Sequence, residues 1–254
     1  MNRPPLDQEI LIILQTAVLV SLSFRLWWTK LHRVYLYFFG YLLAELLQIG
    51  ILIVVPFRTN LYRDAWVATE SITLCFYVLV VLELYGLVLR DLAGIASVSR
   101  RYIKITLAIA ILFSLLPLYF EKTPINTTQY VFLFERAVFS SLVLFLLLIA
   151  IFLAYYPLPL GRNLIVYLVG FAVCFLTKAT ALFINNLSYN WNRQLDTIRM
   201  AATTLCLGYW VFALKPQGES KSIVVSHQWK PEQEERLLSQ LQAINSSLLR
   251  AARK

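Results

Sequence analysis

The chain has 254 residues, of which 59% are hydrophobic and only 15% are charged. About a quarter of the residues in a soluble domain are charged. The low charge and a mean hydropathy of +0.66 exclude an ordinary soluble protein and predict an integral membrane protein. The net charge of +9 does not indicate nucleic-acid binding, because most basic residues stand in short stretches between apolar runs, where they orient a membrane protein.

Two apolar segments, 10–28 and 34–55, open the chain. The first lacks the basic leader and the small-residue cleavage site of a signal peptide, so we expect a membrane-spanning helix. The second begins with aromatic residues, which membrane interfaces favour, and it ends at Pro56. A short basic loop, TKLHR, joins the two segments, which predicts two consecutive spanning helices.

The third apolar segment, 64–90, carries Glu70 and Glu83 inside a stretch that is long enough to cross a bilayer at about 1.5 Å per residue. Carboxylates are costly in a bilayer unless they face other helices, water or a charged partner. We therefore expect this helix near the centre of a bundle. Arg25, at the end of the first segment, is the expected partner of Glu83 in an inner-half packing pair.

Four further apolar segments lie at 102–120, 131–154, 163–184 and 197–214. Seven spans place the termini on opposite sides of the membrane. The stretch after the third segment is the most basic, so the positive-inside rule predicts an external amino terminus and a cytoplasmic carboxyl terminus. The sequence thus predicts an all-α, polytopic seven-transmembrane helix bundle over residues 1–214 and a cytoplasmic tail over residues 215–254, in an inner or plasma membrane.

The tail contains one amphipathic helix. From Pro231 onward the sequence opens with acidic residues and closes with basic ones, as the helix dipole favours. Apolar residues recur at helical spacing and form a stripe on one face. Such a stripe serves to bind a partner helix in a homodimer or in a cytoplasmic protein, to lie on the membrane surface, or to dock under the bundle. The stripe residues are Leu237, Leu241, Ile244 and Leu248.

Polar and charged residues from several spans fall at a similar depth in the outer half of the predicted bundle. Two interpretations of these residues are open. In the first, the residues line a cavity that faces the outside and binds a small ligand, and the basic residues neutralise the acidic ones. Alternatively, they are buried ion pairs that hold the helices together. The residues are Glu45, Gln48, Glu70, Glu135, Arg136 and Lys178.

The sequence offers little for catalysis or metal binding. Its three cysteines all lie within apolar segments, and its two histidines lie in a loop and in the tail. The chain contains no HExxH or CxxC motif and no clustered His and Asp residues. The serines Ser140 and Ser141 have no base beside them in the sequence. We expect no metal, no cofactor and no enzymatic activity.

Three functions fit this plan. The predicted layout resembles the seven-helix sensory regions found ahead of bacterial signalling domains, which implies a receptor-like sensor acting through a separate partner. A weak similarity between the second and third spans and the sixth and seventh suggests a repeat of three helices around a central one, an arrangement that some transporters use. A membrane assembly or scaffold subunit needs only the spans and the tail. We expect a sensor, with a small-molecule or ion transporter or channel as the alternative.

Overall fold

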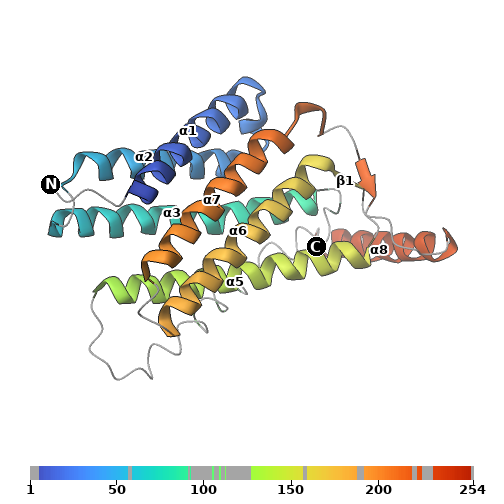
Figure 1. The fold of residues 1–254 in the computed structure, drawn as a ribbon. Coiled ribbons are helices and arrows are strands. Elements are labelled where there is room, and N and C mark those ends of the chain that lie inside the picture. The colour runs from blue at the N-terminus through green and yellow to red at the C-terminus, as the bar shows by residue number, and fades with distance from the viewer. Residues whose placement is uncertain are drawn as a thin grey trace.

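A computed structural model describes residues 6–56, 59–90, 92, 105, 109, 112, 127–156, 159–187, 192–218, 222–224 and 231–252. This part of the chain is almost entirely helical (Figure 1). Its helices are α1 (Leu6–Trp28), α2 (Leu36–Val54), α3 (Asn60–Val88), α5 (Thr127–Tyr155), α6 (Arg162–Leu187), α7 (Asn192–Ala213) and α8 (Pro231–Ala252). Two short strands, β1 (Pro159–Gly161) and β2 (Ser222–Val224), pair in antiparallel fashion.

The predicted all-α membrane fold is confirmed. Five of the described helices are long and apolar enough to cross a membrane, and they are α1, α2, α3, α5 and α6. The fourth predicted span, 102–120, lies outside the described residues apart from three isolated positions. The seventh predicted span corresponds to α7, which is 22 residues long. It is less apolar than the others, because Arg193, Asp196 and Arg199 occupy its first two turns.

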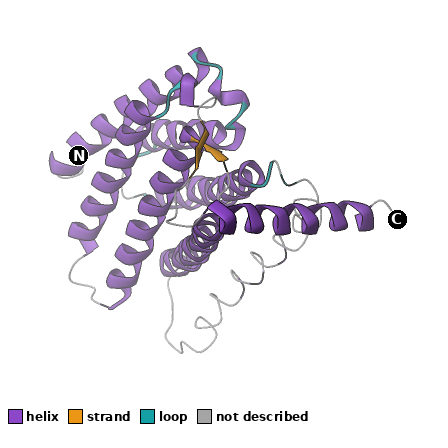
Figure 2. Ribbon diagram, turned by 90° about the vertical axis from the view of Figure 1, so that its right-hand side faces the viewer, coloured by secondary structure: helices purple, strands orange, loops and turns teal. Residues whose placement is uncertain are grey.

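Helices α1, α2, α3, α5, α6 and α7 form a closed arrangement in which α7 lies between α1 and α6. Going around the bundle, α1 contacts α2, α2 contacts α3, α3 contacts α5, α5 contacts α6, and α6 contacts α7, which returns to α1. In addition, α3 contacts α6 across the bundle. The odd-numbered helices α1, α3, α5 and α7 begin at one end, here named the amino end, and finish at the other, here named the tail end (Figure 1). Figure 2 shows the bundle after a turn of 90°, with the carboxyl-terminal helix at one end of it.

Two glycines allow close approach of neighbouring helices. Gly170 on α6 lies directly against the indole of Trp210 on α7, and Gly40 on α2 lies against the ring of Phe76 on α3. A side chain at either glycine would occupy the space of the facing ring, so only hydrogen fits at these contacts without a shift. Both glycines therefore set how closely their helix pairs pack.

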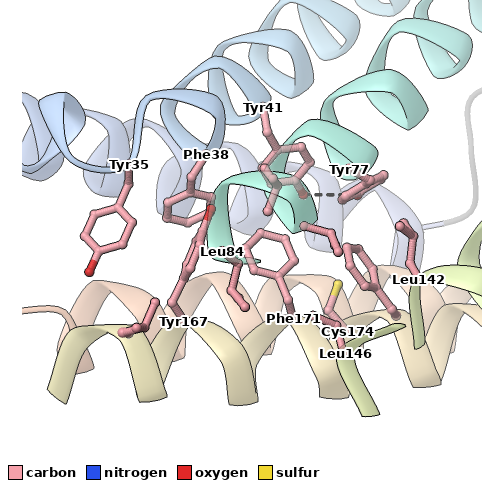
Figure 3. Packing of buried hydrophobic residues seen from close by; sticks show 14 of the residues in the cluster. Tyr35, Phe38, Tyr41, Tyr77, Leu84, Leu142, Leu146, Tyr167, Phe171 and Cys174 are labelled. Atoms are coloured by element: carbon pink, nitrogen blue, oxygen red, sulfur yellow. Dashed lines mark hydrogen bonds between the residues drawn. The ribbon is translucent and has the colours of Figure 1, made fainter. Parts of the chain in front are cut away.

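An aromatic layer fills the centre of the bundle toward the tail end (Figure 3). Phe171 and Trp210 have ring centroids 4.5 Å apart, and the ring of Phe38 packs edge-on against Trp210 at 4.9 Å. Tyr167 joins them through contacts with both Phe38 and Phe171. All four side chains are fully buried. Because large aromatic side chains bury much surface, this layer supplies much of the packing between α2, α6 and α7.

The tail is fastened to the tail end of the bundle. Strand β2 pairs with β1, which immediately precedes α6, in the register Leu160 opposite Ile223. Leu241 on α8 is 2% exposed and belongs to the buried core, whereas Ile244 is 47% exposed. Leu248 is half-buried, and the side chain of Leu237 lies outside the described part of the structure. The predicted stripe is therefore docked at Leu241 and open at Ile244.

Candidate functional site

A group of hydrogen-bonded polar side chains, here named the polar cluster, lies between the aromatic layer and the amino end. Helical spacing brings its members together: Glu45 and Gln48 are three residues apart on α2, and Glu70, Thr73 and Tyr77 follow one another at spacings of three and four on α3. Five helices contribute to it. The cluster consists of Tyr41, Glu45, Gln48, Glu70, Thr73, Tyr77, Glu135, Lys178 and Arg199.

The side-chain amide of Gln48 joins α2 to α3. Its Nε2 donates a hydrogen bond to Glu70 Oε2 at 2.9 Å, and its Oε1 accepts one from Thr73 Oγ1 at 3.3 Å. Both polar ends of the Gln48 amide are thus occupied by α3. Since buried polar groups that lack partners cost free energy, these contacts explain how a glutamine and a glutamate are accommodated inside the bundle.

Tyr77 connects the acidic and basic sides of the cluster. Lys178 Nζ donates a hydrogen bond to the Tyr77 hydroxyl, and that hydroxyl lies 3.2 Å from Glu45 Oε1 and 3.2 Å from the hydroxyl of Tyr41 (Figure 3). Lys178 also lies over the Tyr77 ring, 4.5 Å from its centroid, so the buried ammonium group is stabilised by the aromatic face as well. Lys178 and Glu45 are therefore linked through one phenol.

Glu135 on α5 faces both a positive and a negative group. Its Oε2 accepts from Arg199 Nη2 on α7 at 3.4 Å. The Glu70 carboxyl group on α3 is near enough to interact with it electrostatically. Glu135 is 0% exposed, and no hydrogen-bond donor among the described residues serves its Oε1. Arg199 in turn lies 3.7 Å from Asp196, one turn earlier on α7.

The structure brings five of the six predicted outer-half residues into this cluster, namely Glu45, Gln48, Glu70, Glu135 and Lys178. Arg136 is the exception. It follows Glu135 on α5 but makes no hydrogen bond or ion pair with another described residue. Arg136 was expected to neutralise one of the acidic residues. It does not reach them from its face of α5, because consecutive helical residues point to different faces, and Glu135 pairs with Arg199 instead.

Sequence reasoning missed Arg199, Tyr77, Tyr41 and Thr73. Arg199 lay near the start of the predicted seventh segment, 197–214, but it was not assigned to the outer-half polar group. The helix begins at Asn192 instead, so Arg199 lies in its second turn. The Asp196 and Arg199 pair at helical spacing was the available signal. The two tyrosines and the threonine carried no signal that distinguished them from other residues of the apolar segments.

The predicted packing pair of Arg25 and Glu83 is wrong, because each side chain takes other partners. Arg25 Nη2 donates to the carbonyl oxygen of Leu214 at 2.8 Å. Glu83 accepts from the backbone N–H groups of Tyr37 and Phe38, at 2.9 and 3.3 Å, and from the Tyr167 hydroxyl at 3.2 Å. A carboxylate satisfies unpaired N–H groups at a helix start. Glu83 therefore caps α2 from the neighbouring helix α3.

The arrangement suits charge and proton chemistry. Three carboxyl groups and two basic groups meet here. Glu45, Glu135 and Lys178 are buried, where an unpaired charge costs much more than at a surface, whereas Glu70 and Arg199 are half-buried. Within the described part of the chain, no group of three His, Cys, Asp or Glu side chains is placed to hold a metal ion.

The fold and the cluster define a class: an all-helical, multi-pass membrane protein with a buried polar cluster in one half of its bundle. Comparison with models of protein families, with curated proteins and with solved structures finds no match to this chain.

Proposed function

We propose that the protein is a non-enzymatic membrane sensor, in which a change at the polar cluster is relayed to the tail by α7. The observation that carries this proposal is the course of α7. Near its start, Arg199 is paired with Glu135 in the cluster, and its last turn leads directly into the segment that forms β2 and precedes α8. One rigid helix thus touches the candidate site at one end and the tail at the other.

The contacts at the tail end support a relay. Leu214, just after α7, accepts the hydrogen bond from Arg25 of α1. Asn163, at the start of α6, holds Lys215 on both sides: its Nδ2 donates to the Lys215 carbonyl at 2.7 Å and its Oδ1 accepts from the Lys215 N–H at 3.1 Å. A shift of α7 along its axis or about it would strain these bonds. The tail position is therefore sensitive to α7.

The aromatic layer favours sensing over transport. Transport needs a polar route through the bundle, and the cluster ends where Phe38, Phe171 and Trp210 fill the interior. Phe38 packs edge-on against both other rings, Phe171 and Trp210 are tilted against each other, and all three rings are fully buried. In the proposed orientation, with the amino terminus outside and the tail in the cytoplasm of an inner- or plasma-membrane protein, the cluster faces the outer half and the aromatic layer separates it from the cytoplasm.

Hydrogen exchange of the tail tests the relay. In lipid nanodiscs, Arg199→Gln removes the charge that α7 contributes to the cluster, so we expect faster exchange of the backbone amides in 222–224 and 231–252 than in the parent. Val80→Ala is the matched control, because it destabilises the buried core at α3, a helix whose main contacts are with α2, α5 and α6. Arg63→Gln is the second control, because it breaks an exposed ion pair, with Asp64, in the first turn of α3.

The relay predicts faster tail exchange in Arg199→Gln alone. If Arg199→Gln and Val80→Ala lose the same thermal stability and show equal exchange in the tail, the faster exchange reflects only a general loss of stability. That result would refute the relay.

The transport alternative is tested in proteoliposomes that contain a pH-sensitive dye. If the protein is a sensor, an imposed proton gradient should last as long as it does in empty liposomes. A faster decay of the gradient with the parent protein, abolished in Lys178→Met, would favour transport.

A further inference from the structure

We propose that the turn between α1 and α2 binds the headgroup of an anionic phospholipid, with Lys30 and Arg33 as the ligands of its phosphate. The turn joins the candidate spans Gln8–Trp28 and Leu36–Val54, so residues 29–35 lie where the chain leaves the membrane and enters it again. The headgroups of a bilayer lie at this level, just beyond its hydrocarbon core. The site does not depend on the proposed relay, which runs through α7.

Two backbone hydrogen bonds bring an aromatic residue and two bases together along this turn. The N–H group of Lys30 donates to the Trp27 carbonyl at 3.0 Å, and the N–H group of Arg33 donates to the Lys30 carbonyl at 3.2 Å. Residues at the two ends of such a turn are close in space. Lys30 has a φ of 58°, a left-handed conformation that is unfavourable for residues other than glycine. The chain thus reverses at a lysine, although glycine would adopt this conformation more easily.

The turn is held in place by the residues next to the bases. Leu31 is 5% exposed and belongs to the buried core. Because a carbonyl oxygen only accepts, Nδ1 of His32 donates to the carbonyl of Leu26, at 3.3 Å. The His32 ring also stacks on the ring of Trp27, with centroids 5.5 Å apart. Leu31 and His32 therefore fix the turn without the help of a ligand.

The two bases have no counter-ion within the described part of the chain. Lys30 and Arg33 are exposed, and neither side chain makes a hydrogen bond or an ion pair with another described residue. The sequence from 24 to 37 contains no acidic residue. Glu83 reaches the start of α2, but its two oxygens already accept from backbone N–H groups there. A phosphate supplies the missing negative charge, because lysine and arginine form charge-assisted hydrogen bonds to its oxygens.

An exposed apolar stripe on α1 leads to the two bases, which favours a lipid over free phosphate. Its members recur at spacings of three and four, so they share one face of the helix. The same spacing continues from Trp27 to Lys30 and on to Arg33. A phospholipid has the same order of parts, with apolar chains followed by a charged headgroup, and tryptophan favours the level between them. The stripe consists of Ile10, Ile13, Ala17, Val20, Phe24 and Trp27.

Native mass spectrometry of the full chain tests the site, after the protein in detergent is mixed with equal amounts of phosphatidylglycerol and phosphatidylcholine. We expect the parent to retain phosphatidylglycerol in preference to phosphatidylcholine. A basic residue near the membrane surface strengthens binding to anionic lipid about fivefold, so Lys30→Gln and Arg33→Gln should each weaken retention of phosphatidylglycerol by about that factor. Both side chains are exposed, so thermal unfolding of the variants should match that of the parent.

Arg162→Gln is the matched control. Arg162 is also an exposed base at the tail end, but it begins α6, and α7 lies between α6 and α1 (Figure 1). This variant should retain as much phosphatidylglycerol as the parent. An equal loss in Arg162→Gln and in the two turn variants would overturn the site, because the lipid would then respond only to the overall charge of the tail end. Equal retention of the two lipids by the parent would overturn it without the use of any variant.

Two further outcomes assign the turn or the stripe to another occupant. Inorganic phosphate has the charge of the headgroup but no apolar chain, so an excess of it should leave phosphatidylglycerol bound. Displacement of the lipid by phosphate, but not by chloride at the same ionic strength, would overturn the lipid site in favour of a soluble phosphate. A dimer mass that becomes a monomer mass in Phe24→Ala would assign the stripe to a second copy of the chain and would also overturn the lipid site.

Discussion

Arg25 on α1 donates a hydrogen bond from Nη2 to the backbone carbonyl of Leu214, 189 residues later in the chain, at 2.8 Å. This contact closes the bundle, because α7 is the last helix of the bundle and packs on α1. The last carbonyl groups of a helix have no partner within it. Arg25 therefore both satisfies a carbonyl group at the end of α7 and fixes the point at which the tail departs.

Replacement of Arg25 by methionine should loosen this closure. Methionine keeps much of the apolar stem but removes the donor, and a hydrogen bond from a charged group contributes about 1.5–3 kcal/mol. We expect a lower midpoint of thermal unfolding in detergent for Arg25→Met. Arg33→Met is the control, since Arg33 is exposed and its side chain makes no hydrogen bond to another described residue. An equal decrease in both variants would contradict the structural role of Arg25.

The two glycines at positions 170 and 50 should respond in opposite directions to alanine. Alanine favours a helix over glycine by about 1 kcal/mol, and Gly50 has open space around its position, so Gly50→Ala should raise the free energy of unfolding. At Gly170 the methyl group would collide with the Trp210 indole, and overpacking costs about 1–3 kcal/mol. We expect Gly170→Ala to lower the unfolding midpoint below that of the parent. A rise in both variants would show that α6 and α7 separate easily.

The sequence was a good guide to the helices and a poor guide to their partners. Long apolar runs determine spanning helices because the bilayer requires length and hydrophobicity, and α1, α2, α3, α5 and α6 follow that rule. The ends of helices are less predictable, since polar residues extend them. Thus α7 begins at Asn192 and includes Arg193 and Asp196, whereas the apolar pattern began only at Thr197.

Pairing depends on which helices are neighbours, and apolar periodicity does not encode this. Glu83 and Arg25 looked complementary by depth, yet the close packing of α2 on α3 places the start of α2 beside Glu83. Conversely, depth alone was enough to group four of the cluster residues, because a charged group in a span needs a polar or charged partner. These residues are Glu45, Glu70, Glu135 and Lys178. Their specific links through Gln48 and Tyr77 required the three-dimensional arrangement.

Lys178 and Glu45 should show strong coupling in a double-mutant cycle. Lys178 is 7% exposed and reaches Glu45 through the Tyr77 hydroxyl. Lys178→Met leaves a buried carboxylate without its cation, and breaking a buried pair in this way costs about 3–5 kcal/mol. Adding Glu45→Gln removes that charge, so the double variant should recover most of the lost stability. The measurement is thermal unfolding of all four proteins. Additive effects of the two substitutions would exclude a link between them.

The tail helix offers a matched pair of substitutions on one face. Leu241 is buried in the core cluster, and Ile244, one turn later, is 47% exposed. Truncating a buried leucine to alanine costs about 2–5 kcal/mol, whereas an exposed side chain contributes within about 0.5 kcal/mol. If α8 is docked as the structure shows, Leu241→Ala should increase the rate of limited proteolysis within 231–252, and Ile244→Ala should not. An unchanged proteolysis rate in Leu241→Ala would show that the burial of this residue does not hold α8 in place.

If the predicted stripe instead joins two copies of the chain, Ile244→Ala should shift a dimer to a monomer in size-exclusion chromatography with light scattering.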